Sequence, residues 1–317
     1  MLELNLGSLQ PTPVQKLKES LNDNQFYIKR DDLLPISFGG NKVRKAILFF
    51  EDLERRSCDC VVTYGSSNSN HCRVIANIAA SKELFCYIIS PNETVSKTSN
   101  SQMMELFGAN IIQCSINDIS STIENTLNKL KQKGYTPYFI EGGGHGNLGT
   151  QSYLEVYKEI LNYEKEKGMF FDFIFHTSGT GTTQAGLICG QLLYGDNRKI
   201  IGISNARKCW KGKNVVIDSV NDYLQSIGDK FIEESFIHFI DDYILNGYGD
   251  YNEEILVTIK EILIQEGIPL DPVYTGKAFW GMKKFIEKNQ IKGQNILFIH
   301  TGGIPLFFDS LEELANE

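Results

Sequence analysis

The 317-residue chain lacks the features that mark proteins of membranes, secretion or nucleic-acid binding. No apolar run approaches the roughly 18–20 residues that span a bilayer. Residues 1–10 contain no basic stretch followed by an apolar one, so we expect no signal peptide. No Lys/Arg-rich run is present, and the formal net charge of −8 would repel a phosphate backbone. These absences predict a cytoplasmic protein without a membrane or nucleic-acid partner.

Cysteines with the spacing of a metal site are also lacking. The seven cysteines are scattered, and the pair Cys58 and Cys60 has neither the right separation nor a second half-site. Their number is odd and the chain is not small, so we expect reduced, mostly buried thiols. We expect no metal site, because His71 has no second ligand at helical spacing and is expected to cap or pack.

Internal repeats, low-complexity tracts and obvious linkers are absent as well. What is present is a regular alternation of apolar, β-rich runs with helical patterns. The runs are nearly continuously apolar, which is typical of strands covered on both faces by helices in a parallel sheet. Strands are expected at residues 60–64, 84–89, 109–114, 137–140, 171–176, 200–203 and 296–300. Helices are expected at residues 43–53, 71–81, 100–107, 118–133, 149–166 and 183–193. The predicted class is α/β, with open, mostly parallel sheets covered by helices.

Glycine-rich clusters follow several of these strands. They lie at residues 65–71, 142–149, 178–183 and 301–303. Ligands of open α/β sheets bind outside the carboxyl ends of the strands, so the clusters predict one binding region. The segment 38–42 is a fifth loop that leads into a helix.

The cluster at residues 178–183 has the composition of a phosphate-binding loop. Glycines let the backbone approach an anion, and hydroxyls add donors at the amino terminus of the expected helix. The residues concerned are Gly179, Thr180, Gly181, Thr182 and Thr183. The loop is neither a Walker A loop nor a dinucleotide fingerprint, because the required lysine and third glycine are missing. A capped helix after a tight turn is the local alternative.

Lys42 follows two glycines and stands at the start of an expected helix. A helix amino terminus disfavours a positive charge and so favours a neutral amine. A neutral amine is the form that makes a Schiff base. Taken alone, a lysine at this place is usually a solvated surface residue.

The loop at residues 65–71 offers backbone and side-chain donors suited to a carboxylate. The local alternative is a polar segment that caps the following helix.

Taken in order, these motifs resemble one family closely. It is the fold type II pyridoxal-phosphate enzymes related to tryptophan synthase β, and within them the D-cysteine desulfhydrase and 1-aminocyclopropane-1-carboxylate deaminase branch. The resemblance runs from about Thr12 to Gly303. The segments that carry it are residues 29–32, 39–45, 69–73, 178–187, 271–278 and 300–303.

The resemblance implies a role for each matching residue. Lys42 would form the Schiff base with pyridoxal phosphate and move the Cα proton, Ser69 would bind the substrate carboxylate, and Tyr274 would lie beside the substrate. These three are the expected catalytic residues. The expected cofactor contacts are Lys42, Asn70 at the 3′-oxygen, the loop Gly179–Thr183 at the phosphate, Thr275 at the pyridine nitrogen, Thr301 and Gly302. The expected substrate contacts are Asn68, Ser69, Asn70, His71 and Tyr274.

The resemblance also implies a homodimer of two-domain chains. The large, cofactor-binding domain would hold residues 1–49 and 150–317, and the small domain residues 50–149.

The pair Tyr274 and Thr275 bears on the reaction. In the resembling family, the deaminases carry Tyr-Glu at this place and the desulfhydrases Tyr-Thr. A neutral hydroxyl holds the ring nitrogen protonated less firmly than a carboxylate, which suits immediate loss of a β-leaving group. We therefore expect α,β-elimination from D-cysteine or a similar β-substituted amino acid, yielding pyruvate, ammonia and the leaving group.

Two departures from the family pattern keep other reactions open. Asn68 stands where a glutamine is usual, and the loop around His145 differs from the common Gly-Gly-Ser-Asn pattern. The alternatives are deamination of 1-aminocyclopropane-1-carboxylate and a biosynthetic β-replacement or cyclisation. A non-catalytic binder of pyridoxal phosphate or of a phosphorylated ligand is a further alternative, against which Lys42 argues.

Overall fold

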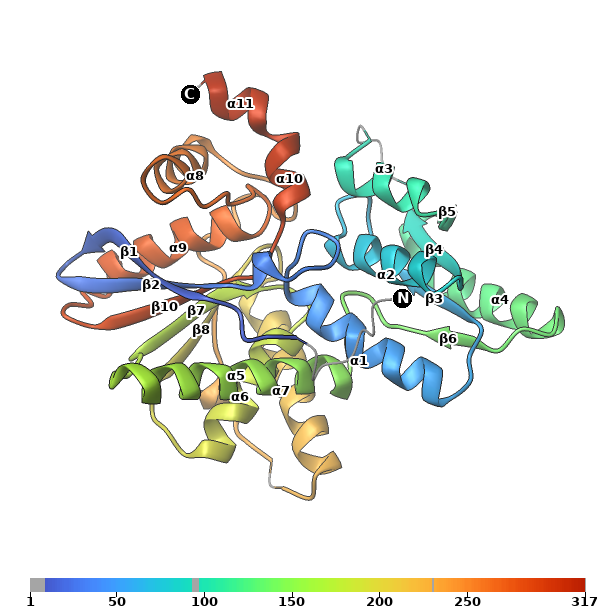
Figure 1. Cartoon of the computed structure of the whole chain (residues 1–317), viewed down its shortest axis with the longest axis horizontal. Helices are drawn as coiled ribbons and strands as arrows, with labels where there is room; N and C mark the ends of the chain where they lie inside the picture. The colour runs from blue at the N-terminus through green and yellow to red at the C-terminus, as the bar shows by residue number, and fades with distance from the viewer. Residues whose placement is uncertain (1–8, 93–96, 230, 317) are drawn as a thin grey trace.

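The computed structural model describes residues 9–92, 97–229 and 231–316. Residues 1–8, which make up most of the segment tested for a signal peptide, lie outside this part of the chain. Residues 93–96 of the expected small domain, residue 230 and residue 317 also lie outside it. The described residues form two β-sheets that stand side by side, each covered by helices (Figure 1). The predicted α/β class with mostly parallel sheets is confirmed.

The larger sheet has six strands. They are β1 (Val14–Leu21), β2 (Asn24–Arg30), β7 (Phe173–Ser178), β8 (Lys199–Ser204), β9 (His238–Ile240) and β10 (Asn295–His300). Their spatial order is β1-β2-β10-β7-β8-β9, and every pairing is parallel except that of β1 with β2. The strands β7 and β10 are almost wholly buried, which explains their continuously apolar sequences.

The smaller sheet has four parallel strands. They are β3 (Cys60–Tyr64), β4 (Phe85–Pro91), β5 (Asn110–Cys114) and β6 (Pro137–Phe139). Their spatial order is β5-β4-β3-β6. Both neighbours of β3 shield it, and its valines are fully buried.

Helices cover both faces of the two sheets. They are α1 (Asn41–Arg55), α2 (Asn70–Ser81), α3 (Ser99–Leu106), α4 (Ile119–Gln132), α5 (Asn147–Lys167), α6 (Thr182–Tyr194), α7 (Cys209–Ser226), α8 (Glu253–Glu266), α9 (Thr275–Lys288), α10 (Ile304–Asp309) and α11 (Leu311–Asn316). One core of the larger sheet packs under α8 and α9, and the other packs under α5, α6 and α7 (Figure 1). Helices α1 and α2 bury their apolar faces on the smaller sheet.

Each sheet has a point at which the strand order reverses. In the larger sheet the chain proceeds from β7 to β8 and β9 on one side, whereas β10 joins β7 on the other side. In the smaller sheet it proceeds from β3 to β4 and β5, whereas β6 joins β3 on the other side. Such reversal points are where open α/β sheets bind ligands, beyond the carboxyl ends of the strands.

We propose that the two domains follow the two sheets. All four strands of the smaller sheet lie between residues 50 and 149, as the sequence predicted for the small domain. The predicted boundaries fall inside α1 and α5, so each of these helices runs from one expected domain into the other.

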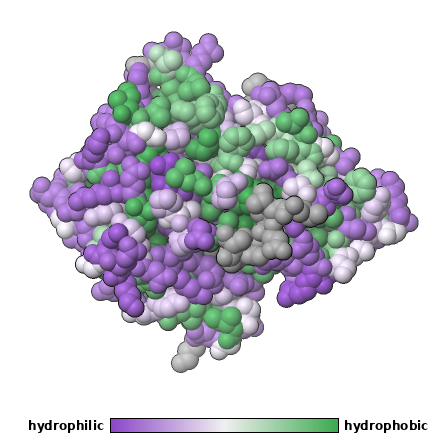
Figure 2. Space-filling model, viewed as in Figure 1, coloured by the Kyte–Doolittle hydropathy of each residue, from purple (hydrophilic) through white to green (hydrophobic). Residues whose placement is uncertain are grey.

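The surface is mostly hydrophilic on the face shown in Figure 2, and hydrophobic residues gather on it near α10 and α3. Phe38, Leu106 and Phe308 are exposed in this region. The homodimer stays a prediction.

All seven cysteines are unpaired thiols, and four of them are buried. Within the described ranges, no helix is long and apolar enough to cross a membrane, and no cluster of three potential metal ligands occurs.

Candidate active site

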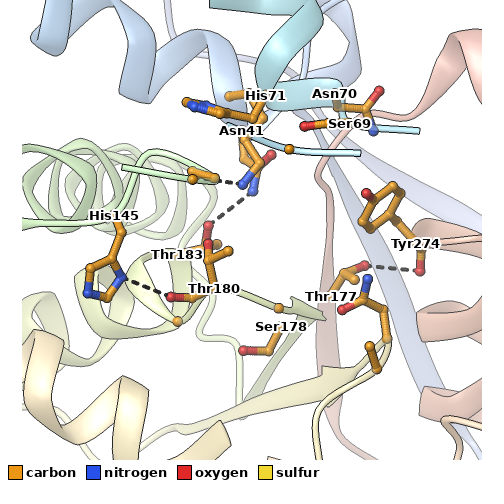
Figure 3. Close-up of a pocket in the computed structure, with 18 of the residues that line it drawn as sticks. Asn41, Ser69, Asn70, His71, His145, Thr177, Ser178, Thr180, Thr183 and Tyr274 are labelled. Carbon is orange, nitrogen blue, oxygen red and sulfur yellow. Dashed lines mark hydrogen bonds between the residues drawn. The ribbon is translucent and has the colours of Figure 1, made fainter. Parts of the chain in front are cut away.

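A cavity of about 420 Å³ lies between the carboxyl ends of the two sheets. Its wall comes from the start of α1, the loops after β3 and β6, and the loops after β7, β8 and β10, so both reversal points open into it. The predicted site residues that line it are Lys42, Ser69, Asn70, His71, Gly179, Thr180, Gly181, Thr183, Tyr274, Thr301 and Gly302 (Figure 3). Three predicted site residues, Asn68, Thr182 and Thr275, do not line it.

Two glycines place Lys42 at the cavity. A Cβ atom on Gly39 would lie 2.2 Å from the Asp32 carbonyl oxygen, and one on Gly40 would lie 2.7 Å from the Thr301 carbonyl oxygen. Both glycines have positive φ, which other residues rarely adopt. The chain can therefore lie directly against the end of β10 before it turns into α1, and Lys42 follows within two residues.

The Lys42 amine has surroundings that favour its neutral form. Its Nζ atom donates to the carbonyl oxygen of Gly143 at 2.9 Å, and the part of the chain that the structure describes places no ion-pairing carboxylate beside it. Burial lowers the pKa of the amine to about 8, although the nearby Cys72 thiol acts in the opposite direction. About a tenth of the amine is therefore unprotonated at pH 7, and a nucleophile needs this neutral form.

The loop after β3 ends in the amino terminus of α2. Ser69 is the N-cap, and its Oγ accepts from the backbone N–H of Cys72 at 3.2 Å. The hydroxyl proton of Ser69 and the positive end of the helix dipole remain available to a carboxylate. His71 reaches the cavity lining, but its Nε2 is directed away to Thr63 Oγ1, to which it donates at 2.8 Å while Thr63 donates to the Ile140 carbonyl. Burial lowers the pKa of His71 well below its usual value, so the ring is neutral.

The loop after β7 forms a cradle for an anion. Gly181 is the N-cap of α6 with a φ of 92°, and no side chain caps that end of the helix. A Cβ on Gly181 would lie 2.8 Å from Val215 Cγ1, so only glycine lets the backbone pass here. The free N–H groups of α6 can therefore bind a phosphate.

Lys45, which the sequence reasoning missed, supports this cradle. Its buried Nζ donates to Thr182 Oγ1 at 2.7 Å in the first turn of α6. Burial and the proximity of Lys42 lower the pKa of Lys45 well below its usual value. A phosphate at α6 would favour its protonated form again. The sequence could have indicated Lys45 as a site residue, because it lies three residues after Lys42 and so on the same side of a helix.

Thr275 lies behind the cavity wall. Its hydroxyl donates to Asp271 Oδ2 at 2.8 Å and accepts from the Asp271 N–H at 3.0 Å. Asp271 in turn accepts from the backbone N–H groups of Val273 and Tyr274, and so fixes the start of α9. The contact of Thr275 with the pyridine nitrogen stays a prediction, and the geometry disfavours it. Thr301 lines the cavity.

Tyr274 is paired with a second tyrosine that the sequence did not reveal. The hydroxyls of Tyr248 and Tyr274 are 2.6 Å apart, and Tyr248 also lies 3.3 Å from Ser66 Oγ on the loop after β3. Burial and the presence of Tyr248 raise the pKa of Tyr274 well above its usual value. Tyr274 therefore keeps its proton and can donate a hydrogen bond.

Both atypical loops line the cavity, although Asn68 itself does not. The Asn68 carbonyl accepts from Asn100. His145 Nδ1 donates to the Thr180 carbonyl at 3.1 Å and so supports the anion cradle (Figure 3). A Cβ on Gly143 would lie 2.5 Å from Thr180 Cγ2, so the loop after β6 is closely packed against the loop after β7.

The arrangement of a nucleophilic amine, an anion cradle and a carboxylate-binding loop in one cavity agrees with comparisons to known proteins. A model of the family described as pyridoxal-phosphate dependent enzymes matches residues 6–302. The chain belongs to this family.

The relatives of this pyridoxal-phosphate enzyme place it in the D-cysteine desulfhydrase and 1-aminocyclopropane-1-carboxylate deaminase branch. The chain is 32% identical over 313 residues to a D-cysteine desulfhydrase of Serratia proteamaculans, with 94% of this chain and 92% of the relative covered. It is 33% identical over 311 residues to a Pyrococcus abyssi protein that carries the name of a 1-aminocyclopropane-1-carboxylate deaminase, with 96% and 93% covered. A crystal structure of an ACC deaminase homologue superimposes with a TM-score of 0.88 at 30% identity and covers 97% of this chain and 94% of its own.

The residues present in the enzyme fit its cofactor. The Lys42 amine can hold the aldehyde carbon, and the uncapped amino terminus of α6, with Lys45 behind it, can hold the phosphate. Thr301 and Gly302 line the cavity at the end of β10, and Asn70 lines it from α2. The glycines of the cradle let its backbone pass close to Asn205 and Val215, where a Cβ atom would not fit.

Proposed function

We propose that this enzyme catalyses α,β-elimination from D-cysteine or a similar small β-substituted amino acid. The products would be pyruvate, ammonia and the leaving group, which is sulfide in the case of cysteine. The main support for this reaction is the composition of the cavity wall at the end of β10 and the start of α9. Thr301, Gly302 and Tyr274 supply hydroxyl and backbone groups there, and no carboxylate lines this wall among the described residues. The D-cysteine desulfhydrase relative supports the proposal.

The chemistry follows from that wall. Bound pyridoxal phosphate supplies an electron-withdrawing ring that makes the Cα proton of an amino acid acidic. A carboxylate at the ring nitrogen would hold that nitrogen protonated, and hydroxyls do so less. A wall of hydroxyls therefore suits a substrate whose β-substituent leaves at once.

Three residues of the chain would handle the substrate. Ser69 and the amino terminus of α2 bind the carboxylate and so fix the Cα–H bond. Lys42 Nζ takes the Cα proton, for which a pKa of about 8 is suitable. Tyr274, kept protonated beside Tyr248, donates a hydrogen bond to the departing sulfur, which leaves as the thiolate when the Cβ–S bond breaks.

A second candidate is deamination of 1-aminocyclopropane-1-carboxylate. The relatives that favour it are the Pyrococcus abyssi protein and the ACC deaminase homologue. Such an enzyme would yield 2-oxobutyrate rather than pyruvate, so the product distinguishes the two reactions.

The test is a product assay on the enzyme loaded with pyridoxal phosphate. D-cysteine, L-cysteine, other β-substituted amino acids and 1-aminocyclopropane-1-carboxylate are incubated separately, and pyruvate, sulfide and 2-oxobutyrate are measured. We expect pyruvate and sulfide from D-cysteine, and their loss in Lys42→Ala. Lys292→Ala, at an exposed lysine, is the matched control and should keep full activity. Release of 2-oxobutyrate alone, or no product from any substrate, would overturn the proposal.

A further inference from the structure

The side-chain amide of Asn70 has an orientation that its neighbours determine. Asn70 lines the cavity from the first turn of α2, next to Ser69 (Figure 3). Its amide can present to the cavity either an oxygen, which accepts hydrogen bonds, or an NH₂ group, which donates them. Only the second orientation can bind an anionic ring oxygen. A role for the second orientation rests on the proposed function, which requires bound pyridoxal phosphate.

Two donors contact the Asn70 side-chain oxygen from the side away from the cavity. Asn100 Nδ2 lies 3.0 Å from Asn70 Oδ1, and Arg73 Nη2 lies 3.4 Å from it. A guanidinium group has only donors. If the Asn70 amide were reversed, its NH₂ group would face both Arg73 and Asn100, and both hydrogen bonds would be lost.

The orientation of Asn100 is fixed in turn by the backbone. Its Nδ2 also donates to the carbonyl oxygen of Asn68 at 3.0 Å, and a carbonyl oxygen can only accept. The nitrogen of Asn100 must therefore face the loop, where it meets both Asn68 and Asn70. A series of hydrogen bonds thus begins at the Asn68 carbonyl and fixes the direction of each amide. It ends with the NH₂ group of Asn70 directed into the cavity.

Each supporting residue leaves one of its polar atoms unpaired in the described part of the chain, although Arg73 Nη1 also donates to Ser37. Asn100 and Arg73 are fully buried. Asn100 Oδ1 and Arg73 Nε have no hydrogen-bond partner within the described residues, and no carboxylate there pairs with Arg73. Buried polar groups are rarely left unpaired in proteins, and their retention indicates a role other than stability.

We propose that Asn100 and Arg73 are positioning residues that hold the Asn70 amide with its NH₂ group directed at the ring oxygen of bound pyridoxal phosphate. Asn100 lies on α3, and Arg73 lies on α2, three residues after Asn70. Neither residue lines the cavity. Arg73 also donates to Ser37 and Asn100 to the Asn68 carbonyl, but only their contacts with Asn70 lead to the cavity. The loss of cofactor affinity on their removal should therefore depend on Asn70.

The first measurement is the dissociation constant of pyridoxal phosphate for the purified apoprotein. Asn100→Asp keeps the size of the side chain but turns an acceptor toward the oxygens of Asn68 and Asn70, so Asn70 is repelled or reversed. We expect at least a tenfold weaker binding of pyridoxal phosphate and a shifted absorption band of the bound cofactor. Asn100→Ala, which only removes the donor, should show a smaller change in the same direction.

Asn24→Asp is the matched control. Asn24 is also buried, and its Nδ2 also donates to two backbone carbonyls, those of Leu21 and Ile291, at the far end of the larger sheet. Both Asn→Asp variants should lose thermal stability, but only the change at Asn100 should alter cofactor affinity and the absorption band. An equal effect of the two changes on the cofactor would overturn the proposal.

A double-mutant cycle separates positioning from general damage to the fold. In an Asn70→Ala background, Asn100→Asp should weaken pyridoxal-phosphate binding less than twofold further. The same tenfold loss with and without Asn70 would contradict the proposal. If the wild-type protein failed to bind pyridoxal phosphate, the proposed function would fail first. Normal wild-type binding with an unaffected Asn100→Asp variant would refute only the positioning role.

Discussion

Lys42 owes its reactivity to its surroundings. Its amine lies in a partly buried site against the Gly143 carbonyl, which can accept a hydrogen bond but cannot neutralise a charge. Burial therefore lowers the pKa, whereas an adjacent carboxylate would have raised it. The amine loses its proton at about pH 8, a range in which many enzymes work.

The rate of covalent cofactor uptake by the apoprotein should follow this pKa. Because the folded-state pKa is lowered to about 8, the amine is protonated below that pH, and its neutral fraction falls about tenfold per pH unit. Uptake followed by absorbance in a stopped-flow instrument should thus rise with pH up to about 8 and level off above it. Lys42→Ala should show no covalent uptake. A rate that keeps rising to pH 10 would mean that the amine is not perturbed.

At this scale, contacts between neighbouring residues were easier to predict than distant ones. Lys42, Ser69 and Asn70 were identified from compact motifs, and the structure brings them to one cavity. Tyr248 and Asn100 were not, because their partners are 26 and 30 residues away, and no local pattern marks such contacts. Thr182 and Thr275 also show that residues in one motif can face opposite sides: Thr183 and Tyr274 line the cavity, whereas their neighbours do not.

At the scale of elements, predictability depended on apolar runs. The strand Cys60–Tyr64 was predicted with its bounds, and the other expected strands were found within two residues at each end, because apolar residues dominate their runs. The hairpin of β1 and β2 was not predicted. β1 is an edge strand with alternating exposed residues, and it gives no apolar run. Helix α9 was also missed, since glycines and the buried Lys277 interrupt its apolar face.

The amino terminus of α6 should depend on glycine in a way that its carboxyl terminus does not. Gly181 and Gly195 cap the two ends of this helix, both with positive φ. An alanine at Gly195, in the left-handed helical region, costs about 1–2 kcal/mol of backbone strain. Gly181, with a ψ of −40°, lies outside that region, so an alanine there is strained more. A Cβ at Gly181 would also meet Val215, whereas nothing lies within 4 Å of one at Gly195.

We therefore expect Gly181→Ala to weaken the binding of pyridoxal phosphate about tenfold or more, and Gly195→Ala to leave it unchanged. Dissociation constants from equilibrium titration of the apoproteins provide the measurement, and thermal unfolding shows that both variants are folded. Equal affinities in the two variants would argue that the phosphate binds elsewhere.

At the scale of the whole molecule, the cavity joins the two sheets. Its wall combines the loops after β3 and β6 with those after β7, β8 and β10. Lys42 stands on α1, whose apolar face packs on the smaller sheet, whereas the anion cradle stands on the larger one. A cofactor bound to both therefore links the two parts of the fold.

Pyridoxal phosphate should accordingly stabilise both sheets together. At 100 times its dissociation constant, a ligand adds about 2.7 kcal/mol to the free energy of unfolding. Trp210 and Trp280 lie on α7 and α9 and report on the larger sheet, while far-ultraviolet circular dichroism reports on both sheets. The two midpoints should rise together in thermal unfolding. A rise seen by fluorescence only, with part of the dichroism signal still lost at the original temperature, would contradict this link. Lys42→Ala should reduce the shift.

The place of β10 has a consequence for biosynthesis. β10 is the last strand of the described chain, yet it lies inside the larger sheet, between β2 and β7. During translation β2 and β7 leave the ribosome long before the strand that pairs with both of them. The nascent chain therefore carries two unpaired, apolar strand edges, which are prone to aggregation until residues 295–300 emerge. The chain can capture its cofactor only after this strand and the cavity residues Thr301 and Gly302 have emerged.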